Sequence, residues 1–413
     1  MSEVITNGRT KVKSDIEFIR HLKTHGGDTM KKCYQCSTCT VVCSLSPEEY
    51  AFPRKEMINA GWGLKDKLVS DPDVWLCHGC MDCSYQCPRG ARPADLLGAV
   101  RSYIYKNFAV PGFMGKAFDS PKYLFWLFLI PIIFITGLIL ASHNWSFEGL
   151  FPIPEGAFRY KQMVAHGPLE MLFIAGNIFV FAMAYAGYKR YWESMRVNLQ
   201  GEPKKNFLKA AIEVFIEFLK HKKFNKCKTN TSRYYGHLFV FYGFLGAMIA
   251  TGIVVLDVMG ILGGKFLPED MNMPIHLFAT FNINNPNDVT EMIGLLTKTF
   301  GLFAGSLLVI GGLMMLIKRM QTQKRDGKSS YYDLLFLWVL WGVAVTGMLL
   351  VLFRLSQTAI LGYPTYFVHL VLVFFLLWYM PYSKFAHMIY RFLGLTFLKM
   401  YGRENKPEIF IKN

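Results

Sequence analysis

Six apolar stretches dominate the second part of the chain, and each is long enough to cross a bilayer as a helix. The residues before 122 contain no comparable run and instead have the pattern of short helices and turns. The pattern therefore predicts a mainly α protein, with a soluble piece at 1–121 and a six-helix membrane bundle at 122–413. The expected spans are 122–142, 164–188, 234–258, 295–317, 332–353 and 363–383.

The segments between the apolar stretches differ in charge, and this difference predicts how the bundle is oriented. Lys and Arg gather in 189–233, in 318–328 and behind the last span, whereas 257–294 is acidic. Since basic segments stay on the cytoplasmic side, we expect both termini and the soluble piece in the cytoplasm. Segment 203–225 has apolar residues on one helical face, which predicts an amphipathic helix on the inner leaflet or a contact for a partner subunit.

Composition supports this division of the chain. The 413 residues are 52% hydrophobic, which is too apolar for an ordinary soluble protein. The net charge of +16 does not indicate nucleic-acid binding, because the basic residues lie in the soluble piece and between the spans. The polar N-terminal stretch is followed by no apolar run, so we expect no cleaved signal peptide and a multi-pass protein of the cytoplasmic membrane. Nine cysteines in such a protein favour metal ligands over disulfides.

Eight of these cysteines form two copies of the motif Cys-x2-Cys-x2-Cys-x3-Cys. In bacterial two-cluster ferredoxins three thiolates of such a motif bind one cubane, and the fourth serves the other cluster. We expect the fourth cysteine to start the helix that leads to the other cluster. Zinc sites favour paired knuckles over this triplet plus one. The assignment is Cys33, Cys36, Cys39 and Cys87 to one [4Fe-4S] cluster, and Cys77, Cys80, Cys83 and Cys43 to the other.

The last apolar stretch carries two histidines, His369 and His387, which are 18 residues apart. Eighteen helical residues make about five turns and span about 27 Å, so both imidazoles leave one helix face near the two edges of the bilayer. Two stacked hemes that each bind this helix once need that spacing; the alternative is two unrelated interfacial histidines. Pro381 lies between the histidines and is expected to kink the helix.

Hemes held by two histidines need a pair at equal depth on facing helices. His237, at the cytoplasmic start of the third span, matches His387, and we expect this pair to hold a proximal heme b. His166, at the outer start of the second span, matches His369 as the pair for a distal heme b, although it could equally be an interfacial histidine. The reserve candidates are His276 and His143, and the histidines expected in solvent are His21, His25 and His221.

Two further expectations concern the surroundings of the hemes. Small residues near the ligands, such as Gly236, Gly243 and Gly246, are expected to leave room for the macrocycle. A quinol site would need a proton acceptor and an aromatic wall near the outer edge. The candidates for it are Glu170, His276 and Arg354, together with Asp257 and Tyr363, most of which could also be simple interfacial anchors.

Two known families resemble the two parts of the chain. The opening CYQCSTC and the two-helix insert after it, over residues 14–106, resemble the small iron–sulfur subunit of heterodisulfide reductase. Residues 164–403 resemble the cytochrome b subunit of respiratory nitrate reductase, through YMPYSKFAH at 379–387, His369 and Tyr235-Gly-His-Leu-Phe. That family has a further histidine where this chain has Ala247, so the resemblance implies that His166 or His276 replaces it.

The combination of both parts resembles the membrane subunits of the quinone-interacting membrane-bound oxidoreductase complexes of sulfate reducers. This resemblance implies two soluble flavin and iron–sulfur subunits as partners, menaquinol as the electron donor, and adenylylsulfate reductase as the eventual acceptor. The alternatives are the membrane subunit of a heterodisulfide- or sulfite-reduction-linked complex, and a passive membrane anchor without quinone chemistry. A redox sensor would need an output domain, for which the sequence has no candidate.

Overall fold

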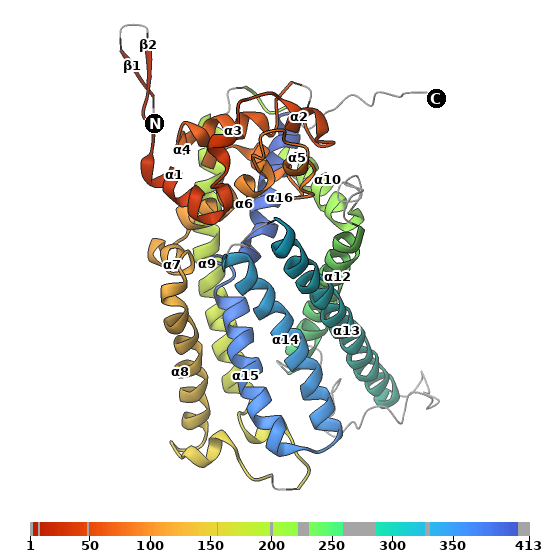
Figure 1. Ribbon diagram of the computed structural model, residues 1–413. Helices are drawn as coiled ribbons and strands as arrows, with labels where there is room; N and C mark the ends of the chain where they lie inside the picture. The colour runs from red at the N-terminus through yellow and green to blue at the C-terminus, as the bar shows by residue number, and fades with distance from the viewer. Residues whose placement is uncertain are drawn as a thin grey trace.

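In a computed structural model, the described residues form a helical head at one end of a long helical bundle (Figure 1). An N-terminal hairpin, β1 (Glu3–Thr6) and β2 (Arg9–Val12), precedes the helices and pairs antiparallel, with Glu3 opposite Val12. The described residues are 3–6, 9–47, 49–154, 156–198, 201–221, 231–258, 286–326 and 331–403.

The head consists of short helices wound around the two cysteine motifs, in agreement with the predicted short helices before and between them. The side chain of Asp15 caps the first helix by accepting a hydrogen bond from Phe18 N. Its elements are α1 (Ile16–Leu22), a π-helical turn (Lys23–Gly27), a 3₁₀ turn (Met30–Lys32), α2 (Thr38–Val42), α3 (Arg54–Gly61), α4 (Lys65–Val69), a 3₁₀ turn (Pro72–Trp75), α5 (Asp82–Tyr85), α6 (Pro93–Phe108) and α7 (Gly112–Phe118).

The bundle consists of long apolar helices, and the prediction of six membrane-length helices is confirmed. The helices are α8 (Leu124–Ser142), α9 (His166–Asn198), α12 (Thr231–Val258), α13 (Pro286–Asp326), α14 (Tyr331–Leu355) and α15 (Ala359–Trp378). Short 3₁₀ turns lie at Pro121–Tyr123, Phe147–Leu150, Tyr160–Gln162 and Lys384–Ala386. The stretches that could cross a membrane are Pro121–Ser142, Gly167–Asn198, Thr231–Leu256, Gly294–Gln321, Tyr331–Leu355 and Ala359–Trp378.

The last span begins and ends earlier than the predicted 363–383 and does not reach His387. Helix α15 ends at Trp378, and a separate helix, α16 (His387–Met400), begins at the histidine itself. Pro381 lies in the break, because proline has no N–H for the helical ladder and disfavours helix in the residue before it. The two histidines therefore lie on different helices, and the expectation that one helix face carries both is wrong.

The small residues of α12 serve a different purpose from the one predicted. A Cβ added at Gly243 would lie 2.8 Å from the carbonyl oxygen of Ala304, and one at Gly246 would lie 2.9 Å from the Ala304 Cβ. Both glycines therefore face α13 and let the two helices pack closely, as small residues do between membrane helices. The expectation that they leave room for a macrocycle is wrong, because α13 occupies that space.

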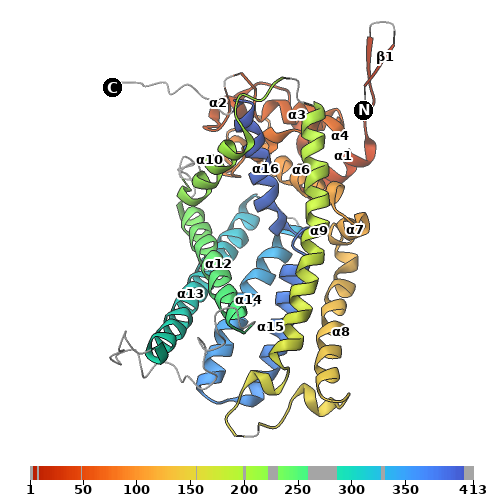
Figure 2. The same ribbon diagram turned by 180° about the vertical axis from the view of Figure 1, so that it is seen from behind.

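The head and the bundle share one hydrophobic core. Trp75 of the head donates from Nε1 to the Tyr191 hydroxyl of α9 at 2.6 Å. Its ring stacks on Tyr390 of α16 with centroids 6.0 Å apart, and it lies over Gly394, where a Cβ would come within 2.5 Å of its ring. Because α9 and α16 extend into the head (Figure 2), buried residues from before and after position 121 belong to one hydrophobic core.

Helix α10 (Phe207–Lys220) lies within the segment predicted to be an amphipathic helix. Its small residues Ala210, Ala211 and Val214 are buried, and it packs against α16. Large apolar side chains, among them Leu208 and Phe215, stay exposed on another face. A helix with one packed face and one exposed apolar face at the end of a membrane bundle suits the lipid interface.

Candidate iron–sulfur and heme sites

The structure brings the four cysteines of the first predicted set together. Cys33, Cys36, Cys39 and Cys87 line one pocket, which is partly open to solvent. Cys87 comes from the second motif, so its placement agrees with the predicted exchange of the fourth cysteine between the two motifs. Burial and the neighbouring Cys33 and Cys36 raise the pKa of Cys39 to about 11, as expected where thiolates crowd together.

The second predicted set also converges. Burial, together with Cys77, Cys43 and Cys80, raises the pKa of the Cys83 thiol. Cys83 packs with Cys39 and Ala94 in one small buried cluster, so the two sets are neighbours. All donors in both sets are cysteine sulfurs. Bound iron would offset the repulsion between such crowded thiolates, so both sets fit thiolate-bound clusters.

Both cysteine loops have the same backbone conformation. The third and fifth residues of each motif are left-handed: Gln35 (φ 67°) and Ser37 (φ 69°) in the first, Gly79 (φ 64°) and Met81 (φ 73°) in the second. Such a winding turns backbone N–H groups toward the inside of a loop, where they favour an anionic group. The Gly79 N–H already donates to the Cys77 sulfur at 3.2 Å.

The fourth cysteine of each motif lies differently from the prediction. Cys43 is the C-cap of α2 and therefore ends that helix, whereas the third cysteine, Cys39, lies inside it. In the second motif Cys83 lies in α5, and the next helix, α6, starts only at Pro93. The fourth cysteines thus follow short helices rather than start long ones, because Ser37 and Met81 begin the helices one turn earlier.

Arginines from two helices hold the start of the second cysteine loop. Arg391 of α16 donates from Nη1 to the Cys77 carbonyl at 3.0 Å and from Nη2 to His78 Nε2 at 2.9 Å. Arg101 of α6 donates to the same Cys77 carbonyl at 3.1 Å and to the Val74 carbonyl at 3.3 Å. His78 is thus a hydrogen-bond partner of Arg391.

A third arginine reaches this loop from the membrane bundle. Arg233, in the first turn of α12, donates to the carbonyl of Gly79. It lies four residues before His237, just as Arg391 lies four residues after His387. Both helices that carry the predicted proximal heme ligands are therefore joined, one turn away, to the loop of the second cysteine set. Reasoning from the sequence missed these arginines, although a basic residue at helical spacing from each histidine was visible in it.

Two of the predicted heme ligands are held in the tautomer that binds a metal. His387 Nδ1 lies 2.6 Å from the Lys384 carbonyl, which can only accept, so Nδ1 carries the proton and the Nε2 lone pair stays available. His369 Nδ1 lies 2.8 Å from the Thr346 hydroxyl oxygen. That hydroxyl is 2.7 Å from the Gly342 carbonyl and donates to it, so it accepts from His369. Such partners orient a ligating histidine from behind.

The remaining predicted ligands are described in part. The ring of His237 lies 5.5 Å from that of His221, measured between centroids, and it interacts electrostatically with His387. The side chain of His166 and the whole of His276 lie outside the described residues. His143 donates from Nε2 to the Met163 carbonyl at 3.0 Å. The distal pair of His166 and His369 therefore stays a prediction.

Arg354 and Tyr363, two of the candidate quinol residues, both contact Phe158. Arg354 donates to the Phe158 carbonyl, and Glu170 interacts electrostatically with Tyr366. The buried Tyr363 donates to the Gln162 side chain at 2.9 Å. His276 and the side chain of Asp257 lie outside the described residues.

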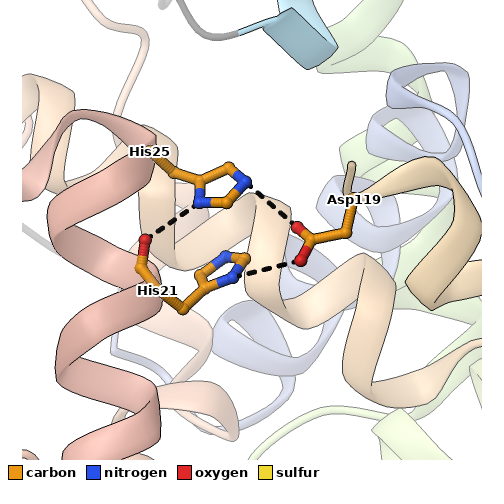
Figure 3. Close-up of side chains that lie close together, drawn as sticks. All are labelled: His21, His25 and Asp119. Atoms are coloured by element: carbon orange, nitrogen blue, oxygen red, sulfur yellow. Dashed lines mark hydrogen bonds and ion pairs between the residues drawn. The ribbon is translucent and has the colours of Figure 1, made fainter. Parts of the chain in front are cut away.

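Two histidines expected in solvent are in fact buried. His21 and His221 are each 7% exposed. His221 lies under Phe241, with ring centroids 4.8 Å apart, whereas His21 meets His25 and Asp119 in a polar cluster (Figure 3). The prediction failed because a basic, polar segment signals charge and not whether a helix will pack on it.

A second polar cluster in the head is acidic. Lys55 Nζ lies 2.6 Å from Asp71 and 2.5 Å from Asp73, and Arg403 lies 2.8 Å from Asp73. Glu56 is fully buried beside them, and burial raises its pKa to about 8. Two cations already compensate these carboxylates, so the cluster connects α3, the 3₁₀ turn at Trp75 and the end of the chain's described part.

Comparison with known proteins adds to the cysteine geometry. Residues 29–91 match the 4Fe-4S dicluster domain family. The chain is 36% identical over 103 residues to the C-subunit of the H(2):CoB-CoM heterodisulfide,ferredoxin reductase of Methanothermobacter marburgensis, which is 25% of this chain and 54% of that protein. It is 31% identical over 90 residues to a protein of Archaeoglobus profundus that is like the C-subunit of heterodisulfide reductase, 22% of this chain and 48% of that one.

A third relative gives a match of similar length. The C-subunit of the ferredoxin:CoB-CoM heterodisulfide reductase of Methanosarcina mazei is 32% identical over 96 residues, 23% of this chain and 58% of its own. The chain thus spans about half the length of the curated relatives it matches. No solved structure matches the chain. The N-terminal region resembles the C-subunit of heterodisulfide reductases and contains a 4Fe-4S dicluster domain, followed by helices able to cross a membrane.

Proposed function

We propose that this protein is the membrane electron-transfer subunit of an oxidoreductase complex, which oxidises menaquinol and delivers the electrons to soluble partners. One observation carries the proposal: Arg233 and Arg391, each one helical turn from a proposed heme ligand, both bind the loop Cys77–Gly79. A passive anchor would have no use for a pair of histidines joined in this way to a cysteine loop.

The residues fit the cofactors that this function needs. The cysteine sets assigned above would hold two [4Fe-4S] clusters, His237 and His387 a proximal heme b, and His166 and His369 a distal one. Bound there, the clusters and hemes would each carry one electron at a time. Lys384 and Thr346 hold the Nδ1 protons of His387 and His369. Both imidazoles are thereby oriented for iron before any heme arrives.

The chain's own residues then determine distance and surroundings. Arg101, Arg233 and Arg391 hold the Cys77 loop against the bundle. The contact of Trp75 with Tyr191 keeps the head seated on α9. On the opposite side of the bilayer we propose that Glu170, His276 and Arg354 form the quinol site and release protons outward.

The partners and the orientation follow from the same proposal. The head and both termini lie in the cytoplasm, at the inner membrane, because the basic segments flank the ends of the spans on the head side. Two soluble flavin and iron–sulfur subunits take the electrons, and adenylylsulfate reductase is the eventual acceptor. A heterodisulfide-reducing partner is the second candidate, because the relatives of the head carry that name.

Heme stoichiometry tests the proposal directly. We expect two b hemes per chain by pyridine hemochrome assay of the purified protein. Replacing His387 or His237 by alanine should each reduce the content to one, since both remove the same heme. His143→Gln is the matched control, because that histidine donates to a backbone carbonyl and should leave both hemes in place.

The same preparation separates an electron-transfer subunit from an anchor. A menaquinol analogue should chemically reduce the hemes, which their absorption bands would report. In the same sample it should reduce the clusters, which their EPR signals would report. Hemes that only dithionite reduces, or a chain purified without heme under heme-sufficient expression, would contradict the proposal.

A further inference from the structure

Three side chains that no part of the proposed electron path uses meet at the junction of head and bundle. His21 in α1 and His25 in the π-helical turn lie one turn apart, and Asp119 is the C-cap of α7. The imidazole rings are nearly parallel, with centroids 3.9 Å apart and planes at 15°. Figure 3 shows both rings turning a nitrogen toward the same carboxylate.

The three donor atoms form a compact set. His25 Nε2 lies 3.1 Å from Asp119 Oδ1, and His21 Nδ1 lies 3.4 Å from Asp119 Oδ2. All three residues offer a ligand atom within 4.8 Å of the others. Two imidazoles and one carboxylate, with a water in the fourth position, are a ligand set that zinc accepts.

The other ring nitrogens are already engaged, and this selects the ligand atoms. His25 Nδ1 lies 2.9 Å from the His21 carbonyl, which can only accept, so Nδ1 carries a proton. His21 Nε2 lies 3.4 Å from the Ser102 hydroxyl. Metal-bound histidines commonly have such a partner on the second nitrogen, which orients the ring and sets its tautomer.

His25 faces oxygen acceptors on both sides, because Nδ1 lies against the His21 carbonyl and Nε2 against Asp119 Oδ1. Burial alone would lower the pKa of His25, but the hydrogen bond and the charge of Asp119 outweigh it and raise that pKa. Burial lowers the pKa of His21, which is 7% exposed. A divalent cation would take the place of the proton between His25 Nε2 and Asp119 Oδ1.

The charges around the cluster allow that exchange. Lys106 Nζ lies 2.7 Å from Asp119 Oδ2, which leaves Oδ1 as the oxygen for a metal. With His25 protonated, the three charges of His25, Lys106 and Asp119 sum to +1. Replacing the His25 proton by Zn²⁺ with a bound hydroxide also gives +1, and zinc lowers the pKa of its bound water toward neutrality. The aromatic ring of Tyr103 covers His21 at 4.8 Å between centroids.

We propose that His21 Nδ1, His25 Nε2 and Asp119 Oδ1 bind a zinc ion with a water or hydroxide as the fourth ligand. The ion would connect the first helix of the head with the end of α7, two residues before the first membrane span begins at Pro121. This site is independent of the electron path, because it shares none of the cysteines or heme ligands proposed above.

The test uses the full chain, purified with its iron in place, incubated with Zn²⁺ and desalted. We expect one zinc per chain by mass spectrometry of the elements. The zinc K-edge spectrum should show only N and O neighbours at about 2.0–2.1 Å, without the sulfur shell at about 2.3 Å that zinc in a cysteine set would give.

Variants locate the ion. His25→Gln and Asp119→Asn should each reduce the retained zinc more than tenfold, with the iron content unchanged as evidence of folding. Lys106→Met should tighten zinc binding, because it removes the competing cation, and His143→Gln should leave it unchanged. Wild-type protein that retains no zinc, zinc with sulfur neighbours, or equal zinc in His25→Gln would each overturn the proposal.

Discussion

Replacing Arg391 by glutamine tests whether the set of Cys77, Cys80, Cys83 and Cys43 holds the cluster next to the proposed proximal heme. The change removes one positive charge and two hydrogen bonds, to the Cys77 carbonyl at 3.0 Å and to His78 at 2.9 Å. Arg101 and Arg233 keep their own bonds to the loop. The loop should therefore remain in place while its electrostatic surroundings change.

The magnitude follows from Coulomb's law. At a separation of about 8 Å and an effective dielectric constant of about 20, a unit charge contributes about 2 kcal/mol. Because about 1.4 kcal/mol corresponds to about 59 mV for a one-electron couple, the expected shift is about 90 mV. The sign is downward, since a nearby positive charge favours the reduced and more negative cluster.

An EPR-monitored redox titration of the purified chain measures this shift. The potential of the cluster assigned to Cys77, Cys80, Cys83 and Cys43 should fall by about 50–100 mV. The potential of the other cluster should fall by less than about 20 mV, because its cysteine set is partly open to solvent, which screens the charge. Arg391→Lys keeps the charge and should shift the potential by less than a third as much. Arg20→Gln, which changes an exposed arginine of the same head, is the control.

Two outcomes would refute the reasoning. Equal shifts of both clusters would mean that Arg391 affects the fold of the head and not one site. An unshifted pair of potentials, with heme and iron contents intact, would mean that the Cys77 loop does not hold a cluster near this arginine.

Two further predictions concern residues behind the sites. Thr346→Val removes the acceptor of the His369 Nδ1 proton, so heme content should fall from about two toward one per chain by pyridine hemochrome, while Thr346→Ser should retain both. Burial raises the pKa of Glu56 from 4.5 to about 8, so the folded head keeps a proton that the unfolded chain releases, and stability should fall as pH rises through that window. Glu56→Gln should remove this pH dependence, which circular dichroism melts from pH 5 to 8 would reveal as a gap on the order of a few kcal/mol at the alkaline end; parallel curves for both proteins would contradict it.

The membrane helices and the cysteine sets were predictable because each is written in local sequence. An apolar run long enough to span the bilayer has few alternatives, and the cysteine spacing follows from the geometry of a cubane. Contacts between distant segments were not predictable in this way. The glycines of α12 were expected beside a heme but lie against α13. The sequence pattern of a helix indicates which residues share a face, but not what packs against that face. His21 and His221 were expected in solvent for the same reason.

Pro381 shows how a local signal was seen and underestimated. Its position between His369 and His387 predicted a kink, yet the helix ends at Trp378 and restarts at His387. Hydrogen bonds from the turn explain the complete break: Ser383 accepts from Phe385 N at 3.2 Å, and Tyr332 donates to the Tyr382 carbonyl at 2.6 Å. Once those groups are satisfied outside a helix, continuing the helix through proline has no energetic advantage.

The opposite directions of α12 and α16 explain why the arginines occur in opposite order on the two helices. Helix α12 begins near the head and runs into the bundle, so Arg233 precedes His237; α16 leaves the bundle and enters the head, so Arg391 follows His387 (Figure 1). In both helices the arginine lies one turn closer to the head than the histidine. Neither His369 nor His166 has a basic residue four positions away in either direction. Arginine contacts with the cysteine loop therefore accompany the pair of histidines at the head end of the bundle. An electron would have to leave the membrane at that end.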